Sequence, residues 1–212
     1  MHKLNRGGPP TCLTSYLYGL NNWGHVTPAN KTDIWYELEA MQGKRCAYCE
    51  KDITNSNKHI EHFRQRSRYP QGTFAWENLF GSCNREVSCG KHKDGCGAYT
   101  PADIIKPDVE DPEVYLVFSQ DGSVNPRKNL SPADYHRATE TIRIFNLNGA
   151  LRQIRVSQVV GYVQTAEAIA EMAVFFPVSD WLPWLQQEIA MTADLPFATA
   201  IKHVLTRQSS NP

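Results

Sequence analysis

The sequence predicts an α+β protein in which a short, zinc-stapled segment lies between an extended N-terminal arm and a mainly helical C-terminal region. Two cysteine pairs bracket a carboxylate, several histidines and an asparagine within residues 46–92. Strand and turn residues fill the space between these pairs, whereas helical periodicity dominates from residue 133 onward. These observations divide the chain into regions 1–43, 44–100 and 101–212.

The first region is predicted to be an arm followed by a lead-in helix. Residues 1–30 are rich in Gly, Pro, Asn and Thr, so they favour an extended segment that must pack on this protein or on a partner. Thr32 and Asp33 are predicted to cap a helix that ends at Gly43. The apolar residues on one face of this helix are Ile34, Leu38 and Met41.

The cysteine-rich middle region is predicted to alternate between short elements and loops. A strand is expected from Lys58 to Phe63, followed by an irregular basic loop from Arg64 to Thr73. Trp76 to Phe80 is expected to form a buried turn or short helix, and a further helix should begin near Cys89.

The last region begins with a proline-rich, acidic stretch, 101–112, that is typical of a linker. A hairpin is expected over 113–124, and Ser131 followed by Pro132 predicts a helix start. The predicted helices cover 133–145, 149–172, 180–190 and 195–206, with a break at Pro196. Candidate anchors for a partner are the aromatic residues Phe175, Phe176, Trp181 and Trp184.

Composition indicates an ordinary globular protein. The chain has 212 residues, no formal net charge and 41% hydrophobic residues, and no apolar run is long enough for a membrane span. The first residues do not resemble a signal peptide, so we expect a cytoplasmic protein without membrane association. Residues 44–95 nevertheless contain ten Lys and Arg against six Asp and Glu, a net charge of +4 that favours a phosphate polymer as partner.

Four of the six cysteines have the paired spacing of a metal site, which in a cytoplasmic protein favours Zn²⁺ over disulfides. The predicted ligands are Cys46, Cys49, Cys83 and Cys89. Cys96 could replace Cys89 as the fourth ligand, and Cys12 stands alone. Because the segment is short and polar, zinc binding is expected to supply much of its folding free energy.

The residues between the cysteine pairs suggest a second, catalytic metal. Glu61 can bind Mg²⁺ or Mn²⁺, and the adjacent His62 can take a proton from water. Asn78 is suited to brace the loop beside this pair, and His92 could meet Glu61 across the metal. Asn84 competes for this ligand position, and His59 is a third ligand or a phosphate contact. Candidate contacts to nucleic acid are Arg64, Arg66, Arg68, Lys91 and Lys93.

The order of these residues resembles the HNH endonuclease motif. The resemblance implies a ββα-metal nuclease core in which His62 is the general base, Asn78 is the central asparagine, and Glu61 and His92 hold the divalent cation. Gly90 departs from the pattern, because HNH proteins usually place the last ligand directly after the final cysteine.

The flanking residues resemble more specifically the HNH subunit of the Septu antiphage system and its retron-associated relatives. The resemblance covers residues 44–95, with Arg45 to Glu50, Ile60 to Arg64 and Asn78 to Phe80 as the matching segments. It implies a bacterial defence nuclease that acts with an ABC-type ATPase subunit (PtuA). The alternative is a non-catalytic zinc module that binds nucleic acid or a protein partner. The sequence leaves open whether DNA or RNA is the substrate.

Overall fold

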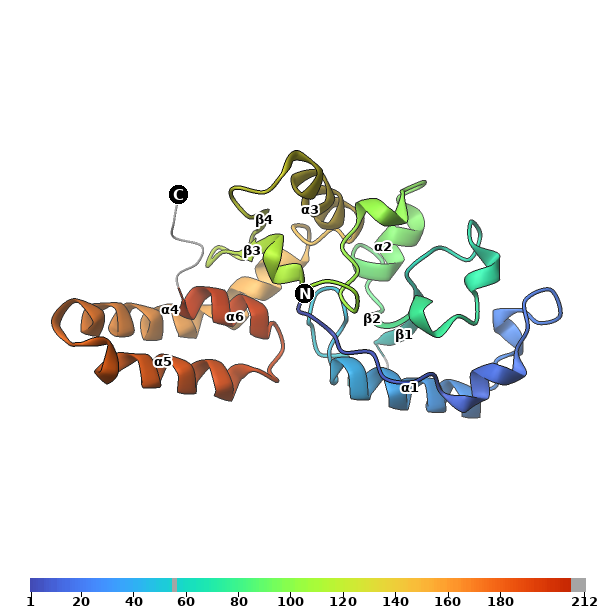
Figure 1. The fold of residues 1–212 in the computed structure, drawn as a ribbon, viewed down its shortest axis with the longest axis horizontal. Coiled ribbons are helices and arrows are strands. Elements are labelled where there is room, and N and C mark those ends of the chain that lie inside the picture. The colour runs from blue at the N-terminus through green and yellow to red at the C-terminus, as the bar shows by residue number, and fades with distance from the viewer. Residues whose placement is uncertain (55–56, 207–212) are drawn as a thin grey trace.

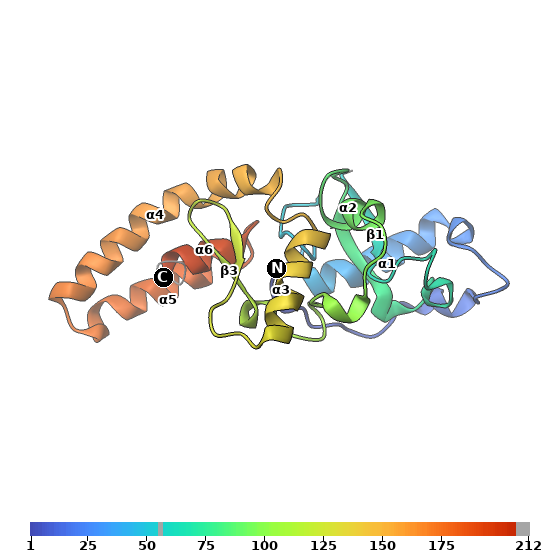
Figure 2. The same cartoon turned by 90° about the horizontal axis from the view of Figure 1, so that it is seen from above.

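The computed structural model describes residues 1–54 and 57–206 as an elongated molecule with two differently built halves (Figures 1 and 2). One half contains the first of two two-stranded sheets with helices against it, and the other half ends in the projecting helices α4 and α5. The helices are α1 (Pro28–Gln42), α2 (Cys89–Gly95), α3 (Pro132–Ile144), α4 (Leu151–Phe175), α5 (Val178–Thr192) and α6 (Ala198–Leu205). The strands are β1 (Lys58–His62), β2 (Leu79–Cys83), β3 (Leu116–Phe118) and β4 (Val124–Pro126).

The N-terminal arm packs on the rest of this chain. Its start lies near the centre of the molecule, and the arm then runs beside α1 (Figure 1). Leu4 is buried and donates its amide to the Pro107 carbonyl at 2.8 Å. Arg6 pairs with Asp108 at 2.6 Å and donates to the Trp76 carbonyl at 2.7 Å. Two short 3₁₀ turns, Thr11–Ser15 and Trp23–His25, complete the arm.

Helix α1 starts earlier than the sequence predicted. Thr27 rather than Thr32 or Asp33 is the N-cap, because its side chain accepts the Asn30 amide and Pro28 fits the first helical position. The predicted end is confirmed, since Gly43 has a positive φ of 65° that suits glycine. The predicted apolar face is also confirmed, with Ile34, Leu38 and Met41 all buried.

The first sheet and α2 form a ββα unit against α1. Strands β1 and β2 are antiparallel, with Glu61 opposite Phe80 and His62 opposite Leu79. The side-chain amide of Gln42 bonds both the amide and the carbonyl of Gly81 at 2.9 Å. A Cβ at Gly81 would lie 2.6 Å from the same Gln42 amide, so this close approach of α1 to β2 requires glycine.

Residues 101–112 do not form the loose linker that their composition suggested. Ile104 and Ile105 are buried, and the Ile105 amide donates to the Thr141 hydroxyl at 2.8 Å. A short 3₁₀ turn at Pro101–Asp103 packs against α3. The apolar pair therefore outweighs the surrounding prolines and fixes the connection on the core.

The C-terminal region follows the predicted order of a hairpin and helices. Strands β3 and β4 form the hairpin, Ser131 caps α3, and Pro196 separates α5 from α6. Buried His203 holds α6 to β3, because its Nδ1 accepts the Phe118 amide at 3.0 Å. Among the described residues, none of the helices has the length and apolar character needed to cross a membrane.

Helices α4 and α5 form the end of the molecule farthest from α1 (Figures 1 and 2). Of the predicted partner anchors, Phe175, Phe176 and Trp184 are exposed here, whereas Trp181 is half-buried. Docking of a partner on this hairpin stays a prediction.

Candidate functional site

The four cysteines predicted to bind zinc converge on one point of the ββα unit. Their sulfur atoms all lie within 4.8 Å of one another, and Cys46, Cys49, Cys83 and Cys89 are all buried. The Cys49 and Cys83 sulfurs are 3.9 Å apart. A tetrahedral Zn²⁺ with Zn–S bonds of about 2.3 Å would place its ligands about 3.8 Å apart, so the cage has the size that zinc requires.

The backbone explains how the wide gap between Cys83 and Cys89 still closes the cage. Cys89 has a positive φ of 55°, and its amide donates to the Phe145 carbonyl at 2.9 Å. Cys96 lies outside the cluster and donates to the Lys93 carbonyl at 3.2 Å, so Cys89 is the fourth member. Burial opposes ionisation, yet hydrogen bonds from the other three thiols hold the pKa of Cys46 well below its usual range.

Glu61, at the end of β1, is held by two cationic or ionisable side chains. The Lys93 ammonium lies 2.7 Å from Glu61 Oε1, and His59 Nε2 lies 2.9 Å from Oε2. Glu61 is 2% exposed and Lys93 is completely buried. Burial by itself would raise the pKa of Glu61, but the hydrogen bond to His59 and the charge of Lys93 together lower it.

The His62 side chain contacts different parts of the protein from those that the Glu61 side chain contacts. Its Nε2 lies 2.9 Å from the Thr73 carbonyl, and its ring meets the Trp23 ring edge-on at 4.6 Å. Burial lowers the pKa of His62 to about 4, against the opposing effect of its hydrogen bond to Thr73. The imidazole is therefore neutral at pH 7. Successive residues of a strand point to opposite faces, and these two described residues share no hydrogen bond.

Asn78 fastens the loop that follows His62. Its Oδ1 accepts the Arg64 amide at 2.7 Å, and its Nδ2 donates to the carbonyls of Arg64 at 3.2 Å and of Gly72 at 3.0 Å. Gly72 directly precedes Thr73, whose carbonyl contacts His62. The buried amide of Asn78 thus fixes both ends of the loop 64–72 relative to β1.

Helix α2 presents Gly90 and Lys93, and not His92, to Glu61. A Cβ at Gly90 would lie 2.3 Å from Glu61 Oε2. His92 instead places Nδ1 2.9 Å from the Ile144 carbonyl at the end of α3. Each residue of an α-helix advances by about 100°, so His92 lies roughly 200° from Gly90 around the axis. The structure therefore does not bring His92 to Glu61. Exposed Asn84 donates its backbone amide to the Asn57 carbonyl at 3.0 Å.

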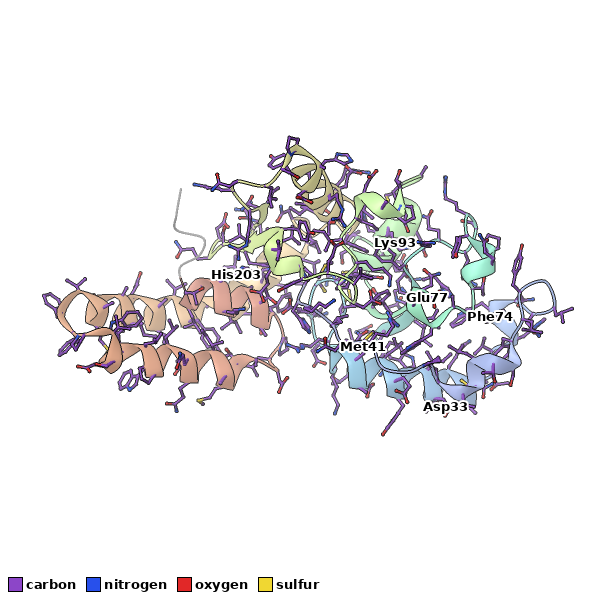
Figure 3. The ribbon with its side chains drawn as sticks, in the orientation of Figure 1. Asp33, Met41, Phe74, Glu77, Lys93 and His203 are labelled. Carbon is purple, nitrogen blue, oxygen red and sulfur yellow. The ribbon has the colours of Figure 1, made fainter. Side chains whose placement is uncertain are left out.

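The predicted basic contacts separate into two groups. Arg64, Arg66 and Arg68 are exposed and Lys91 is half-buried, whereas Lys93 is completely buried and does not present its ammonium at the surface. Figure 3 shows Lys93 within the densely packed half of the molecule.

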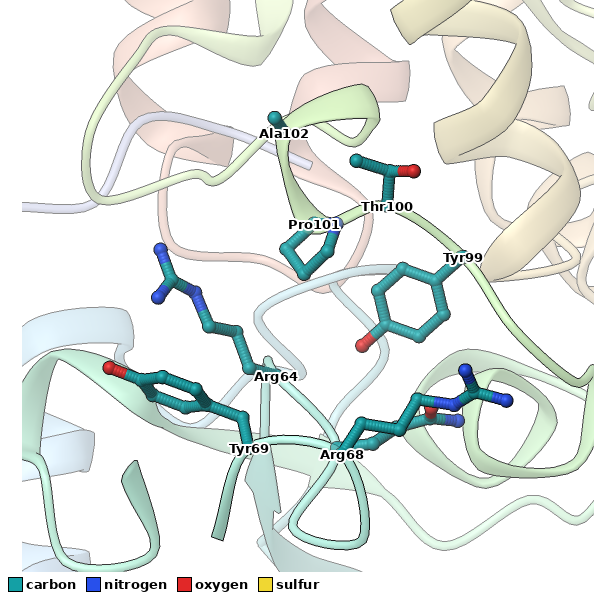
Figure 4. A pocket seen from close by; sticks show the side chains of 8 residues that line it. Arg64, Arg68, Tyr69, Tyr99, Thr100, Pro101 and Ala102 are labelled. Carbon is teal, nitrogen blue, oxygen red and sulfur yellow. The ribbon is translucent and has the colours of Figure 1, made fainter. Parts of the chain in front are cut away.

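A hollow of about 390 Å³ opens beside the loop that Asn78 holds. Arg64 and Tyr69 lie on one side and Tyr99 and Pro101 on the other (Figure 4). The Arg64 guanidinium stacks 4.8 Å over the Tyr69 ring, and the Tyr99 hydroxyl donates to the Phe63 carbonyl. The Lys93 ammonium lies 5.6 Å from the Tyr99 ring, so the hollow adjoins the buried Glu61–Lys93 pair.

Comparison with known proteins gives two relatives. A protein from Vibrio cholerae serotype O1 biovar El Tor, named as an HNH endonuclease of retron Vc95, is 28% identical over 116 residues. The Septu protein PtuB of Bacillus thuringiensis is 28% identical over 160 residues. The chain is thus distantly similar to an HNH endonuclease and to a Septu protein. The matches cover 52% and 73% of the chain and 55% of each relative, so the chain spans about half the length of the curated relatives it matches. No family model matches the chain.

The two metals predicted from the sequence fit the structure unequally. The buried four-cysteine cage has the donors, the spacing and the free thiols that a structural zinc needs. Glu61 and His92 do not form a comparable site for Mg²⁺ or Mn²⁺, because both carboxylate oxygens and one imidazole nitrogen have other partners. In residues 1–54 and 57–206, the cysteine cage is the one cluster of three or more His, Cys, Asp or Glu that could hold an ion.

Two contacts of the candidate site were not predicted from the sequence. Trp23 reaches His62 from the N-terminal arm, a contact for which no local sequence signal exists. The Glu61–Lys93 pair had a signal, since Gly90 stands at the usual ligand position and Lys93 follows it by one helical turn.

The buried, neutral His62 predicts a pH-dependent stability. The unfolded chain binds a proton at this residue near its usual pKa of about 6.5, whereas the folded chain resists protonation until about pH 4. Its contribution to the free energy of unfolding is therefore complete above pH 6.5. It falls by up to about 1.4 kcal/mol per pH unit as the pH drops toward 4, about 3 kcal/mol in total. Urea denaturation at pH 7, 6 and 5 should show a steeper loss for the parent than for His62→Asn. Equal slopes would contradict a neutral His62.

Proposed function

We propose that this chain is an HNH-type nuclease that hydrolyses phosphodiester bonds of nucleic acid in bacterial antiphage defence. The observation that carries the proposal is the cysteine cage, which joins the turn 46–49 to the end of β2 and the start of α2. Strand β1, which ends in Glu61-His62, is paired with β2. The name of the Vibrio cholerae relative, an HNH endonuclease, agrees with this activity, and the name of the other relative agrees with a Septu-type protein. The proposed metal of the cage is Zn²⁺, in keeping with its four thiolate donors.

In the proposed reaction His62 is the general base. A carbonyl oxygen only accepts hydrogen bonds, so the contact of Nε2 with Thr73 requires that Nε2 carry the proton. Nδ1 then has the free lone pair that can take a proton from water. An approaching phosphate would raise the pKa of His62 from about 4 and make it a stronger base. Asn78 acts as a positioning residue, because it fixes the peptide next to the Thr73 carbonyl.

The proposed substrate surface is the exposed loop 64–72 and the hollow beside it. Arg64 and Arg68 supply positive charge, and Tyr69 and Tyr99 supply aromatic rings at the same place. Arginine neutralises phosphates, and aromatic rings stack on unpaired bases, so this surface suits a nucleic-acid strand. The net charge of +4 over residues 44–95 favours the same partner, a nucleic acid.

A substrate panel tests the proposal. The zinc-loaded protein should cleave labelled oligonucleotides, and the panel should contain single- and double-stranded DNA and RNA, with and without an ABC-type ATPase subunit of a Septu system. An Arg64→Gln/Arg68→Gln variant should bind the cleaved substrate about tenfold more weakly at low salt and with a smaller salt dependence. Lys128→Gln, at an exposed site after β4, is the matched control and should bind as the parent does. Equal affinity of the arginine variant would place the substrate elsewhere.

The second candidate function is a non-catalytic zinc module that binds nucleic acid. The engagement of Glu61 by Lys93 favours it, because a buried, neutralised carboxylate needs no role in catalysis. Absence of cleavage together with tight, zinc-dependent binding would support this alternative.

The proposed docking surface for the ATPase is the α4–α5 hairpin, where Phe175 and Trp184 are 79% and 61% exposed.

A further inference from the structure

The Glu61 carboxylate resembles a cation-binding site in which the bound cation is the ammonium group of a side chain, Lys93. Lys93 approaches one carboxylate oxygen at 2.7 Å and His59 approaches the other at 2.9 Å. A Cβ at position 90 would lie 2.3 Å from Glu61 Oε2, so the carboxylate leaves no room there for a residue larger than glycine. A buried carboxylate requires a compensating charge, and here a side chain provides it.

Several contacts hold the lysine in this position. Lys93 also pairs with Asp94 at 2.6 Å, and its backbone carbonyl accepts from Gln65 at 3.1 Å. Burial would lower the pKa of Lys93, but the charge of Glu61 raises it above its usual range, so the ammonium is charged at neutral pH. The helix phase that brings Lys93 to Glu61 also turns His92 toward the Ile144 carbonyl.

We propose that the Lys93 ammonium is the resident cation of the Glu61 site and takes the place that a divalent metal would otherwise occupy. The parent chain should then bind no second divalent cation at Glu61, although its cysteine cage holds zinc. The proposal concerns the same site as the proposed nuclease. Its test measures metal binding and not cleavage, so the two ideas can fail separately.

Removal of the lysine should open the site to a metal. Lys93→Met keeps the length of the side chain but removes its charge, which leaves Glu61 and His59 as oxygen and nitrogen donors. Zinc-loaded parent and variant would be titrated with MnCl₂, and bound Mn²⁺ measured by electron paramagnetic resonance. We expect Lys93→Met to bind one Mn²⁺ at least about tenfold more tightly than the parent, because a competing unit charge has been removed. Glu61→Gln/Lys93→Met should lose this site, and Lys91→Met on the same helix should behave as the parent.

Equal Mn²⁺ affinities of the parent and Lys93→Met, whether strong or weak, would overturn the proposal. Zinc content and circular dichroism establish that each variant is folded. If Lys93→Met does not fold, the comparison of the parent with Glu61→Gln decides the question. Micromolar Mn²⁺ binding by the parent that Glu61→Gln abolishes would show that a metal displaces the lysine, against the proposal. Weak binding that is the same in both would support it.

Discussion

Replacement of Cys46 with serine should release the zinc and unfold the β1–β2–α2 unit. The turn 46–49, the end of β2 and the start of α2 meet at the sulfur cluster, where four buried cysteines lie within 4.8 Å of one another. Structural zinc sites contribute an apparent binding free energy of about 10–16 kcal/mol, much of which appears as folding stability. Elemental analysis after dialysis should therefore fall from about one zinc per chain to a small fraction of that. Hydrogen exchange at the β2 amides should become fast.

The matched control for this experiment is Cys96→Ser. Cys96 lies outside the cage and donates to the Lys93 carbonyl, so its removal should leave the zinc content unchanged. A Cys46→Ser protein with slow β2 exchange and no zinc would show that hydrophobic packing alone holds this unit. Such a result would contradict the structural role of the cage.

Lys93→Ala should be the most destabilising single substitution outside the cage. It leaves the Glu61 carboxylate buried without its 2.7 Å ion pair. Removal of one partner of a buried ion pair typically costs about 3–5 kcal/mol, because the remaining charge has lost its compensation. Urea denaturation should show a loss of this size in the free energy of unfolding.

Two further variants distinguish this explanation from a general effect of altering α2. Lys91→Ala removes a lysine whose ammonium lies 3.7 Å from exposed Glu86, and it should cost less than about 1 kcal/mol. Glu61→Gln/Lys93→Met removes both charges and should recover much of the lost stability. If the double variant is no more stable than Lys93→Ala, the effect comes from packing and not from the unpaired carboxylate.

Much of the fold could be predicted from local sequence signals, such as residues that start or end a helix. Ser131-Pro132 marks the start of α3, Gly43 marks the end of α1, and the strand predicted from Lys58 to Phe63 corresponds to β1. The cysteine cage was also predictable, because thiol pairs at this spacing have few other uses in a chain without disulfides.

The parts that could not be predicted depend on contacts between distant segments. The arm reaches Pro107 and Trp76, and Ile104 and Ile105 join the core, although their neighbours are typical of a linker. At the candidate site, the residue that contacts Glu61 depends on the helix phase of α2, which the sequence did not reveal. Cys89 fixes where this helix begins, and the phase then directs Lys93 rather than His92 to Glu61.

Cleavage by His62→Ala most directly tests whether a zinc-stapled scaffold presents a catalytic imidazole. Parent and variant, each with one zinc per chain, would be compared under single-turnover conditions on the oligonucleotide that the parent cuts best, with exposed His136→Ala as control. Loss of a general base should slow cleavage by about 100- to 10,000-fold while zinc content stays the same. A zinc-loaded His62→Ala protein that cuts at the parental rate would show that this imidazole is not the base.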